Sequence, residues 1–206
     1  MTNEVTIWES KDKVYEIRKI FCKDLTPSEF DTFLAIGRAT GLNPFLRELW
    51  AIKYNGKQAA IFIGRDGYRR AAQDNPDYDY HYSDAVYAND SFEMKNGVVS
   101  HSYKLNDRGQ LIGAYAVAKR KNSSMPVFTF VELKEYTSIV SQIWKQKPAT
   151  MIKKVAEAQV LRMSFQKLFA MTYDESENWK VKEDTKVTEV EPIQPDEDII
   201  KQNTHE

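Results

Sequence analysis

The chain has 206 residues, of which 42% are hydrophobic and 29% charged, and its formal net charge is −1, so we expect one domain with a hydrophobic core. No apolar stretch reaches the roughly 18 residues that a membrane-spanning helix needs, and no basic region precedes an apolar run near Met1, so we expect neither a membrane span nor a secretory signal. The single cysteine, Cys22, excludes an intramolecular disulfide and a cysteine-based zinc cluster, which favours a cytoplasmic protein.

The first part of the chain predicts two helices and a hairpin. Apolar residues at helical spacing indicate a short helix over 11–23. A second helix is marked by the cap Thr26, Pro27 at its first position, Glu29 three residues after the cap, and Gly41 as its stop. The segments 48–54 and 57–63 flank Asn55-Gly56 and predict a hairpin with a two-residue turn.

The middle of the chain predicts an antiparallel sheet. Gly64 to Gly67 interrupts the second hairpin strand, and a short helix is expected from Tyr68 to the vicinity of Asn75-Pro76. Alternating tyrosines over 77–87 predict a strand with one aromatic face and a bulge near Val86, and further strands are expected over 92–94, 98–105, 111–119 and 127–131. In the segment 114–118 three alanines share one face, so a helix of the same chain or a ligand strand should lie close over them.

The last ordered element is expected to be a long helix that begins at Pro148. Its apolar stripe through Val155, Ala158, Phe165 and Phe169 should face a core, and Arg162 falls inside that stripe. A charge at such a position is costly without a partner. An internal carboxylate and the backbone of a bound polyanion remain equally open as that partner.

The acidic end of the chain contrasts with a basic body. Residues 174–206 hold 11 Asp and Glu against 4 Lys and Arg, a net charge of −7, so residues 1–173 carry +6. A basic body with an acidic tail is typical of polyanion-binding proteins, although many such asymmetries serve only solubility. The fold expected is therefore α+β, with antiparallel strands and hairpins packed against helices, a long C-terminal core helix and a tail of little fixed structure.

Motifs for nucleotide hydrolysis, metal binding and nucleophilic catalysis are absent. No G-x-x-x-x-G-K-[ST] loop occurs, and the three histidines have no metal-ligand spacing. Asp77, Asp79 and Asp84 could form a two-metal nuclease site, but the solvent-exposed face of a strand is the simpler interpretation. We therefore expect a binding protein without an organic cofactor or metal rather than an enzyme.

Cations and aromatic residues together point to single-stranded nucleic acid. Cations can follow the phosphates while aromatic rings stack on bases, at about 1–3 kcal/mol per base. For the arginines after the hairpin, a solvated helix end is the alternative. The candidate binding residues are Arg65, Tyr68, Arg69, Arg70, Lys119, Arg120, Lys121, Lys145, Lys147, Lys154 and Arg162.

Three sequence blocks carry a resemblance to a known family. They are GLNPFLRELWAIKY at residues 41–54, IGRDGYRRAA at 63–72, and the pattern W-K-Q-K-P-x-x-M-I-K-K-x-A-E-A-Q-x-L-R-M-S-F at 144–165, followed by Tyr173-Asp174-Glu175. In this order and spacing they resemble the Bet/RecT family of phage recombination proteins, and the Bet branch most closely. The resemblance covers about residues 30–175.

The resemblance implies an ATP-independent single-strand annealing protein, present as a ring or helical filament of identical subunits. It implies that Arg162 and the lysines of the last helix, Lys153 among them, contact the phosphate backbone, and that the block from Arg65 to Arg70, including Tyr68, lines the DNA groove or a subunit contact. Partners implied are single-stranded DNA, the annealed duplex, a phage 5′–3′ exonuclease and the host single-strand binding protein. A passive single-stranded DNA-binding protein without annealing activity is the alternative.

The resemblance also suggests a division of the chain. Residues 1–24 are expected to form an N-terminal helical segment used in oligomerisation, residues 25–174 the DNA-annealing core domain, and residues 175–206 an acidic tail. Composition alone gives only the boundary of the tail.

Overall fold

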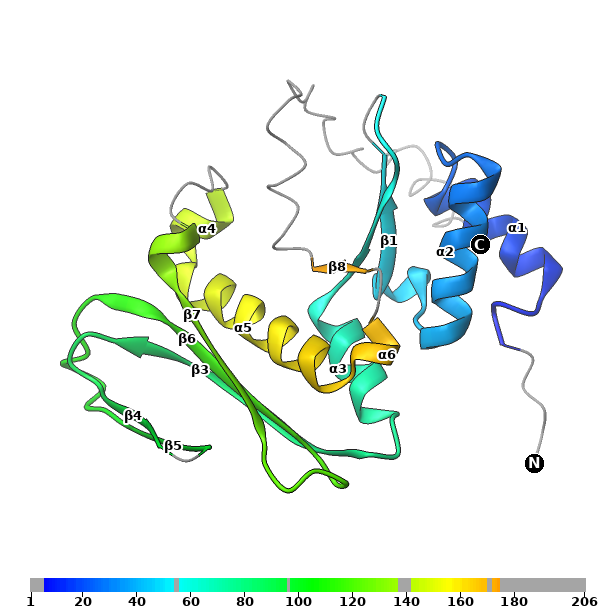
Figure 1. Cartoon of the computed structure of the whole chain (residues 1–206). Coiled ribbons are helices and arrows are strands. Elements are labelled where there is room, and N and C mark those ends of the chain that lie inside the picture. Colours follow the sequence, from blue (N-terminus) through cyan, green and yellow to red (C-terminus); the bar gives the residue numbers. More distant parts are fainter. Residues whose placement is uncertain (1–5, 54–55, 96, 137–141, 170–171, 175–206) are drawn as a thin grey trace, which may run out of the picture.

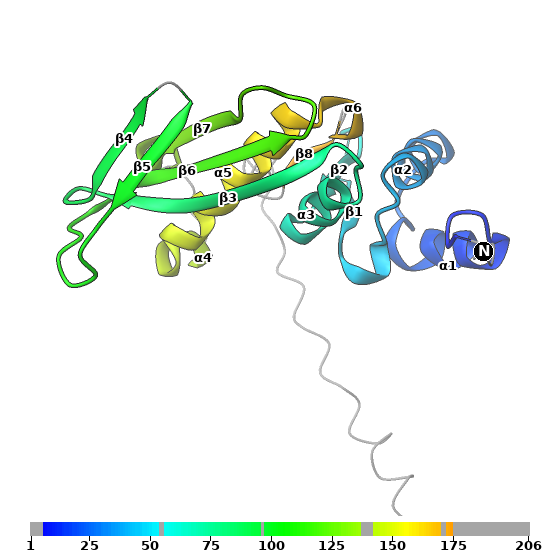
Figure 2. The same ribbon diagram turned by 90° about the horizontal axis from the view of Figure 1, so that it is seen from below.

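The computed structural model describes residues 6–53, 56–95, 97–136, 142–169 and 172–174. A long helix, α5 (Pro148–Ser164), lies across one face of a three-stranded antiparallel sheet of order β3-β6-β7, and a two-stranded hairpin lies at the other face (Figures 1 and 2). A second three-stranded sheet and three helices pack beyond one end of α5. The expected α+β class, with antiparallel strands and a long helix near the end of the core, is confirmed.

The first two helices form as the sequence predicts. Helix α1 (Lys11–Phe21) begins after Ser10, whose hydroxyl accepts a bond from the Lys13 amide. Helix α2 (Pro27–Thr40) has the complete capping box between Thr26 and Glu29, and it ends at Gly41, which adopts a left-handed conformation with φ of 66°. Helix α2 is followed by the short 3-10 helix η1 (Pro44–Leu46).

The predicted hairpin exists with shorter strands than expected, and its Asn55-Gly56 turn lies partly outside the described residues. Strands β1 (Leu49–Ile52) and β2 (Ala60–Ile63) pair antiparallel with Ile52 opposite Ala60. Within the described residues, the ladder therefore stops well before the Asn55-Gly56 pair. Next to the ladder, the Glu29 carboxylate of α2 accepts hydrogen bonds from the Ala59 amide and the Lys53 ammonium. The Ala59 amide therefore bonds to α2 and not to the opposite strand.

Helix α3 (Arg65–Gln73) starts three residues earlier than predicted, directly after Gly64. Gly67 therefore lies inside the helix and does not interrupt it. Glycine is needed at this position because the helix packs closely against the neighbouring backbone. A Cβ atom at Gly67 would lie 2.6 Å from the carbonyl oxygen of Glu48.

The strands in the middle of the chain form two antiparallel sheets, where a single sheet was expected. Strand β6 (Leu111–Arg120) pairs antiparallel with both β3 (Tyr78–Tyr87) and β7 (Val127–Glu132). Strands β4 (Ser91–Lys95) and β5 (Val98–Ser102) form a separate hairpin. The predicted bulge near Val86 is confirmed, with a register shift between Val86 and Tyr87.

The alanine face of β6 is covered by α5, which confirms that a helix of the same chain lies over it. Ala114, Ala116 and Ala118 are fully buried and belong to the same hydrophobic cluster as Ile152 and Ala156 of α5. Small side chains on the strand allow the helix to approach closely. On the opposite face, a second cluster forms around Tyr115 and Val117, against side chains of the β4–β5 hairpin.

The tyrosines of β3 do not share one face. A second register shift between Tyr78 and Tyr80 inserts Asp79 as an extra residue. Tyr78 therefore packs into the main core near Phe165, whereas Tyr80 and Tyr82 stack on each other with ring centroids 6.1 Å apart and remain exposed on the opposite face.

Replacing Gly113 by alanine is expected to lower the free energy of unfolding by about 1–3 kcal/mol, because a Cβ atom there would lie 2.2 Å from the Val131 carbonyl oxygen in the paired strand. Urea denaturation would measure the change. Gly56→Ala is the control, since its Cβ would meet nothing within 4 Å and its cost should come only from the positive φ of 76°. Equal effects of the two substitutions would contradict this packing explanation.

The predicted long helix is shorter than its apolar stripe. Helix α5 ends at Ser164, Phe165 takes a non-helical conformation, and the short helix α6 (Gln166–Phe169) follows. Strand β8 (Tyr173–Asp174), which the sequence analysis did not predict, pairs parallel with β2. The predicted acidic tail, residues 175–206, lies outside the described residues.

The segment before α5 contains the 3-10 helix η2 (Leu133–Tyr136) and helix α4 (Gln142–Gln146). The rings of Tyr136 and Trp144 stack with centroids 5.4 Å apart, so α4 is joined to η2. In the part of the chain that the structure describes, no helix has the length and apolar character needed to cross a membrane.

Candidate nucleic-acid interface

Helix α5 carries two of the predicted binding residues, Lys154 and Arg162. Its sheet-facing side includes Ile152 and Ala156, both fully buried, and Gln159, whose side-chain oxygen accepts a bond from the Thr129 hydroxyl of β7 at 3.1 Å. Successive helical residues are about 100° apart, so Lys154, Ala158 and Arg162 lie roughly opposite Ala156. These three residues therefore face away from the main sheet.

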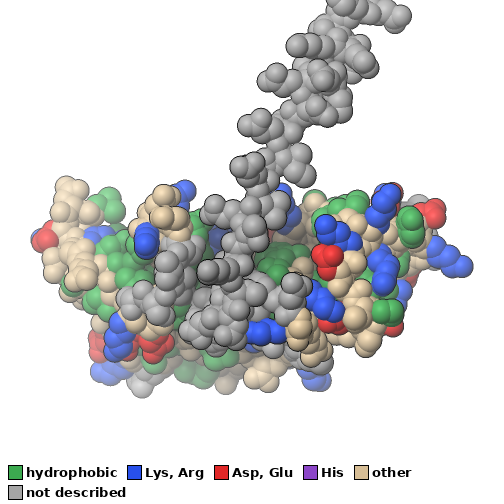
Figure 3. All heavy atoms as spheres, turned by 90° about the horizontal axis from the view of Figure 1, so that it is seen from above, with side chains coloured by type: hydrophobic (Ala, Val, Ile, Leu, Met, Phe, Trp, Pro, Cys, Tyr) green, Lys and Arg blue, Asp and Glu red, His purple; other side chains and the backbone are tan. Residues whose placement is uncertain are grey.

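The face of α5 turned away from the sheet is only partly open. Lys154 and Arg162 are half-buried, and Ala158 between them is buried at 3% exposure within the main cluster. Ala158 therefore leaves no open surface between the two cations. Figure 3 looks onto this side of the molecule, where Lys and Arg side chains lie on both sides of hydrophobic ones.

The amino-terminal end of α5 is open and basic. Lys147 stands at the cap position without a side-chain cap, and the first turn contains no acidic residue. Lys145 and Lys147 are both exposed. Free amide groups and the helix dipole favour anions at such an end, and two lysines add to that preference.

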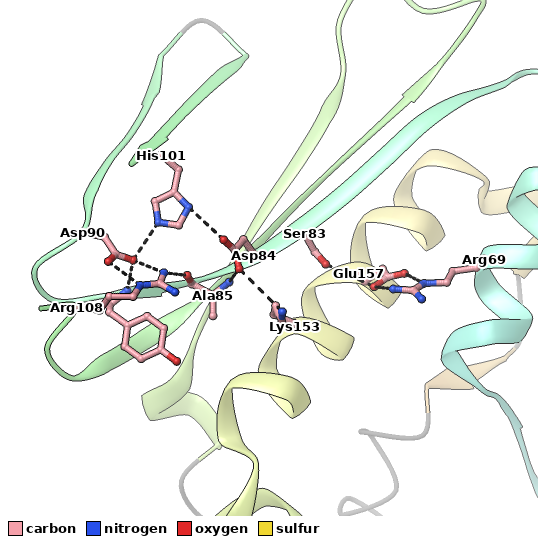
Figure 4. Close-up of polar contacts among 10 residues, drawn as sticks. Arg69, Ser83, Asp84, Ala85, Asp90, His101, Arg108, Lys153 and Glu157 are labelled. Atoms are coloured by element: carbon pink, nitrogen blue, oxygen red, sulfur yellow. Dashed lines mark hydrogen bonds and ion pairs between the residues drawn. The ribbon is translucent and has the colours of Figure 1, made fainter. Parts of the chain in front are cut away.

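Lys145, Lys147 and Lys154 share a further property. Within the described ranges, none of the three has a carboxylate oxygen within 4.0 Å. Lys153 differs, because it points toward β3, where its ammonium lies 4.0 Å from the Asp84 carboxylate (Figure 4). Lys153 and Lys154, the two neighbouring lysines of the motif, therefore point in different directions.

The arginines of α3 are engaged with buried carboxylates. Arg69 donates from Nε and Nη2 to the two carboxylate oxygens of Glu157, the second at 2.9 Å (Figure 4). Glu157 lies on α5 with a side chain only 3% exposed, and His81 contacts the same carboxylate from β3 at 3.2 Å. This cluster connects α3, α5 and β3.

The electrostatics of the Glu157 cluster favour the ionised carboxylate. Burial raises the pKa of Glu157, but the hydrogen bonds from His81 and Arg69 and the positive charge of Arg69 outweigh it and lower the pKa from 4.5 to about 2. An ionised carboxylate only accepts, so His81 donates from Nε2, and its Nδ1 shares a hydrogen bond with the Tyr78 hydroxyl at 2.8 Å.

Arg70 is held in the same way. Its guanidinium donates at 2.7 Å to each carboxylate oxygen of Glu48, which is 8% exposed, and also to the carbonyl of Gly41. The hydrogen bond to Glu48 raises the pKa of Arg70. Arg69 and Arg70 are therefore ion-paired although their side chains remain 39% and 36% exposed, and their role toward DNA stays a prediction.

Tyr68 and Arg65 complete the α3 block. Tyr68 is fully buried, and its ring lies 4.8 Å from that of Phe169, so it presents no ring face to solvent. Arg65, at the first position of α3, is 36% exposed and lies 3.4 Å from the neighbouring Asp66.

The basic residues predicted as a loop lie at the end of β6 and directly after it, and they are partly neutralised. Lys119 donates to Asp79 at 2.9 Å, which raises the pKa of Lys119, and Arg120 donates to Asp77 at 2.8 Å. Lys121 is exposed and donates to the carbonyl of Pro76. Asp77 and Asp79 thus face different cations, and no group of three or more residues suited to hold a metal occurs in the described ranges.

Three acidic residues with buried side chains escaped the sequence analysis. Glu48 and Glu157 are two, and Asp90, whose side chain is fully buried at the base of the β4–β5 hairpin, is the third. Arg108 and His101 bond to Asp90 from two sides (Figure 4), and the Arg108 hydrogen bond holds the pKa of Asp90 well below its usual range. The only sequence signal for Glu157 was its place between Ala156 and Ala158 on a core helix, where a charge needs a partner.

Comparison with known families supports the motif resemblance. The model of the RecT family matches residues 8–191, which is most of the chain and includes all three sequence blocks. No match was found among the curated proteins with which the chain was compared. RecT proteins act in phage DNA recombination, where they anneal single strands, and they are not classical enzymes. The match over residues 8–191 shows that the chain belongs to the RecT family.

Proposed function

We propose that this protein binds single-stranded DNA and anneals complementary strands without ATP, as a cytoplasmic homo-oligomer. Family membership supports the reaction. The observation that supports the binding site is the uncapped amino-terminal end of α5 with Lys145 and Lys147 beside it, together with Lys154, because no carboxylate in the described ranges neutralises these three cations.

The spacing of these lysines suits a nucleic-acid backbone. Lys147 and Lys154 lie on the same side of α5, two turns and about 10 Å apart. Successive phosphates of a B-form strand rise by about 3.4 Å, so this distance corresponds to about three nucleotides. Arg162 extends the same row by about 12 Å. A strand held in this way would be bound through its phosphates.

Binding through phosphates leaves the bases available for pairing. Contacts to phosphate neutralise the charge that keeps two strands apart, but they carry no sequence information and cover no base edge. Annealing needs both properties, since a fully covered strand cannot pair. The buried Tyr68 fits this account, because it offers no ring for stacking on a base.

The other predicted residues take different positions in this proposal. Arg69 and Arg70 position α3 against α5 and against the segment between η1 and β1 through their carboxylate partners. Arg65, Lys119, Arg120, Lys121 and Lys153 lie on other surfaces, and we propose them as contacts to the duplex or to a neighbouring subunit. The exonuclease and the host single-strand binding protein remain proposed partners.

Annealing of two complementary oligonucleotides, one fluorescently labelled, tests the proposed function against passive binding. The protein should accelerate duplex formation over the protein-free rate in buffer without nucleotide, and added ATP should not change the rate. Tight binding without acceleration would support the passive single-stranded DNA-binding protein instead.

A further inference from the structure

Two tyrosines of β3 form an exposed pair on the sheet face opposite α5. The ring centroids of Tyr80 and Tyr82 lie 6.1 Å apart, the ring planes are 23° from parallel, and the two residues are 39% and 44% exposed. Tyr82 also meets the buried Tyr115 of β6 edge to face, which fixes the position of its ring. This pair is the part of the alternating tyrosine motif that the proposed function does not use.

The tyrosine pair is not part of the hydrophobic core. The β4–β5 hairpin packs on the same sheet face around Val86, Tyr115 and Val117, and within the described residues neither Tyr80 nor Tyr82 belongs to this cluster or to the main one. A single exposed aromatic residue is ordinary on a protein surface. Two exposed rings in contact form an apolar patch, and such patches are typical of binding sites.

Cations lie beside the tyrosine pair. Lys119 of β6 stands opposite Tyr80 in the antiparallel ladder, so the two side chains share a face. Its ammonium pairs with Asp79 at 2.9 Å, but the side chains of Lys119 and Asp79 are 27% and 36% exposed, so a phosphate can replace the carboxylate. Lys121 follows β6 directly and is exposed, and it has no carboxylate oxygen within 4.0 Å among the residues that the structure describes.

Exposed rings next to cations fit single-stranded nucleic acid. Aromatic rings stack on bases of any sequence while cations bond to the phosphates. A duplex does not fit, because its bases stack on one another and present only their edges in the grooves. Stacking on a tyrosine covers the face of a base and leaves its pairing edge open, so this contact is compatible with annealing.

We propose that Tyr80 and Tyr82 form a second contact to single-stranded DNA, which holds unpaired bases by stacking. This inference rests on the proposed function and extends it. Helix α5 packs against the alanine face of β6 and the tyrosine pair lies on the opposite face, so the two surfaces contact different nucleotides. The inference also gives Lys119 and Lys121 a single strand as their partner in place of the duplex or a neighbouring subunit.

The test is fluorescence anisotropy with labelled oligothymidine and with an abasic oligonucleotide of the same length, at one salt concentration. Both oligonucleotides carry the same phosphates, but only the first has bases. The unmodified protein should prefer oligothymidine, and the double substitution Tyr80→Ala and Tyr82→Ala should reduce this preference by about tenfold or more. The substitution of both by phenylalanine should retain the preference, because the rings remain. Tyr15→Ala is the matched control on α1, where Tyr15 is 68% exposed, and it should leave the preference unchanged.

The outcomes separate this inference from the proposed function. An unchanged preference in the alanine variant, or equal losses in the alanine and phenylalanine variants, would overturn the inference. A smaller sedimenting mass of the alanine variant without DNA would assign the pair to a contact between subunits and would also overturn it. Equal binding of the two oligonucleotides by the unmodified protein would contradict this inference alone, whereas binding of neither would refute the proposed function as well.

Discussion

Replacing Glu157 by glutamine is expected to lower the free energy of unfolding by about 3–5 kcal/mol at neutral pH. The substitution keeps the size of the side chain but removes the charge that Arg69 and His81 contact, and the Glu157 side chain is only 3% exposed. Arg69 then keeps its charge, with one weaker acceptor, in a partly buried position. Urea denaturation at pH 7 measures the change.

The effect of Glu157→Gln should depend on pH in a defined direction. The pKa of Glu157 is lowered from 4.5 to about 2 in the folded protein, so its contribution is fully present above pH 4.5 and is lost as the pH falls through about 2. The difference between the two proteins should therefore shrink by about 3 kcal/mol between pH 5 and pH 2.

Asp66→Asn is the control for Glu157→Gln. Asp66 lies 3.8 Å from the same Arg69 but its side chain is 79% exposed, so the change should be within about 0.5 kcal/mol. If Glu157→Gln also remained within about 1 kcal/mol of the unmodified protein, the cluster would not be what holds α3 and β3 to α5.

The triple substitution of Lys145, Lys147 and Lys154 by glutamine is expected to give the largest loss of DNA binding. Each lysine that neutralises a phosphate adds about 0.7 to the slope of the logarithm of affinity against the logarithm of salt concentration. Removal of three should flatten the slope by about 2, which corresponds to about a 100-fold weaker affinity at 0.1 M salt. Fluorescence anisotropy over a salt series measures both quantities.

The matched control removes three exposed lysines elsewhere, Lys11, Lys95 and Lys104. These lie on α1, on β4 and after β5, away from α4 and α5 (Figure 1). Since the net charge changes equally, a steeper loss in the first variant would be specific to the α4–α5 surface. Equal salt slopes for the two variants would contradict the proposed site.

Much of the fold was predictable because its signals are local. The capping box of Thr26 and Glu29, the stop at Gly41 and the start of α5 at Pro148 each depend on residues within one or two turns. The small face of β6 indicated a close helix, and α5 occupies that place.

Other features depend on distant partners and could not be predicted from the sequence. Glu157 and Arg69 are 88 positions apart, so the sequence showed two charges but not their pairing. The extra residue Asp79 in β3 moved Tyr78 to the opposite face from Tyr80 and Tyr82, a shift that alternation alone cannot reveal. Strand β8 has only two residues, too few for a hydrophobic alternation to predict it, and it forms by pairing with the edge of β2.

The candidate site was predictable as a set of cations but not as a surface. Family motifs selected Lys153 and Lys154 equally, yet the first faces Asp84 on β3 and the second faces away from the sheet. The arginines of α3 were candidate binding residues with a solvated helix end as the alternative, but Glu48 and Glu157 engage two of them. The pairing follows from the packing of α3 against α5, which carries Glu157, and against Glu48, which precedes β1.

The most direct test of the central claim is the annealing rate of complementary oligonucleotides in nucleotide-free buffer, measured for the unmodified protein and for the Lys145, Lys147 and Lys154 triple variant. Our account predicts that the protein accelerates annealing well above the protein-free rate and that the triple variant, still folded, loses most of this acceleration while the Lys11, Lys95 and Lys104 variant retains it. Full acceleration by the α4–α5 variant would contradict the account.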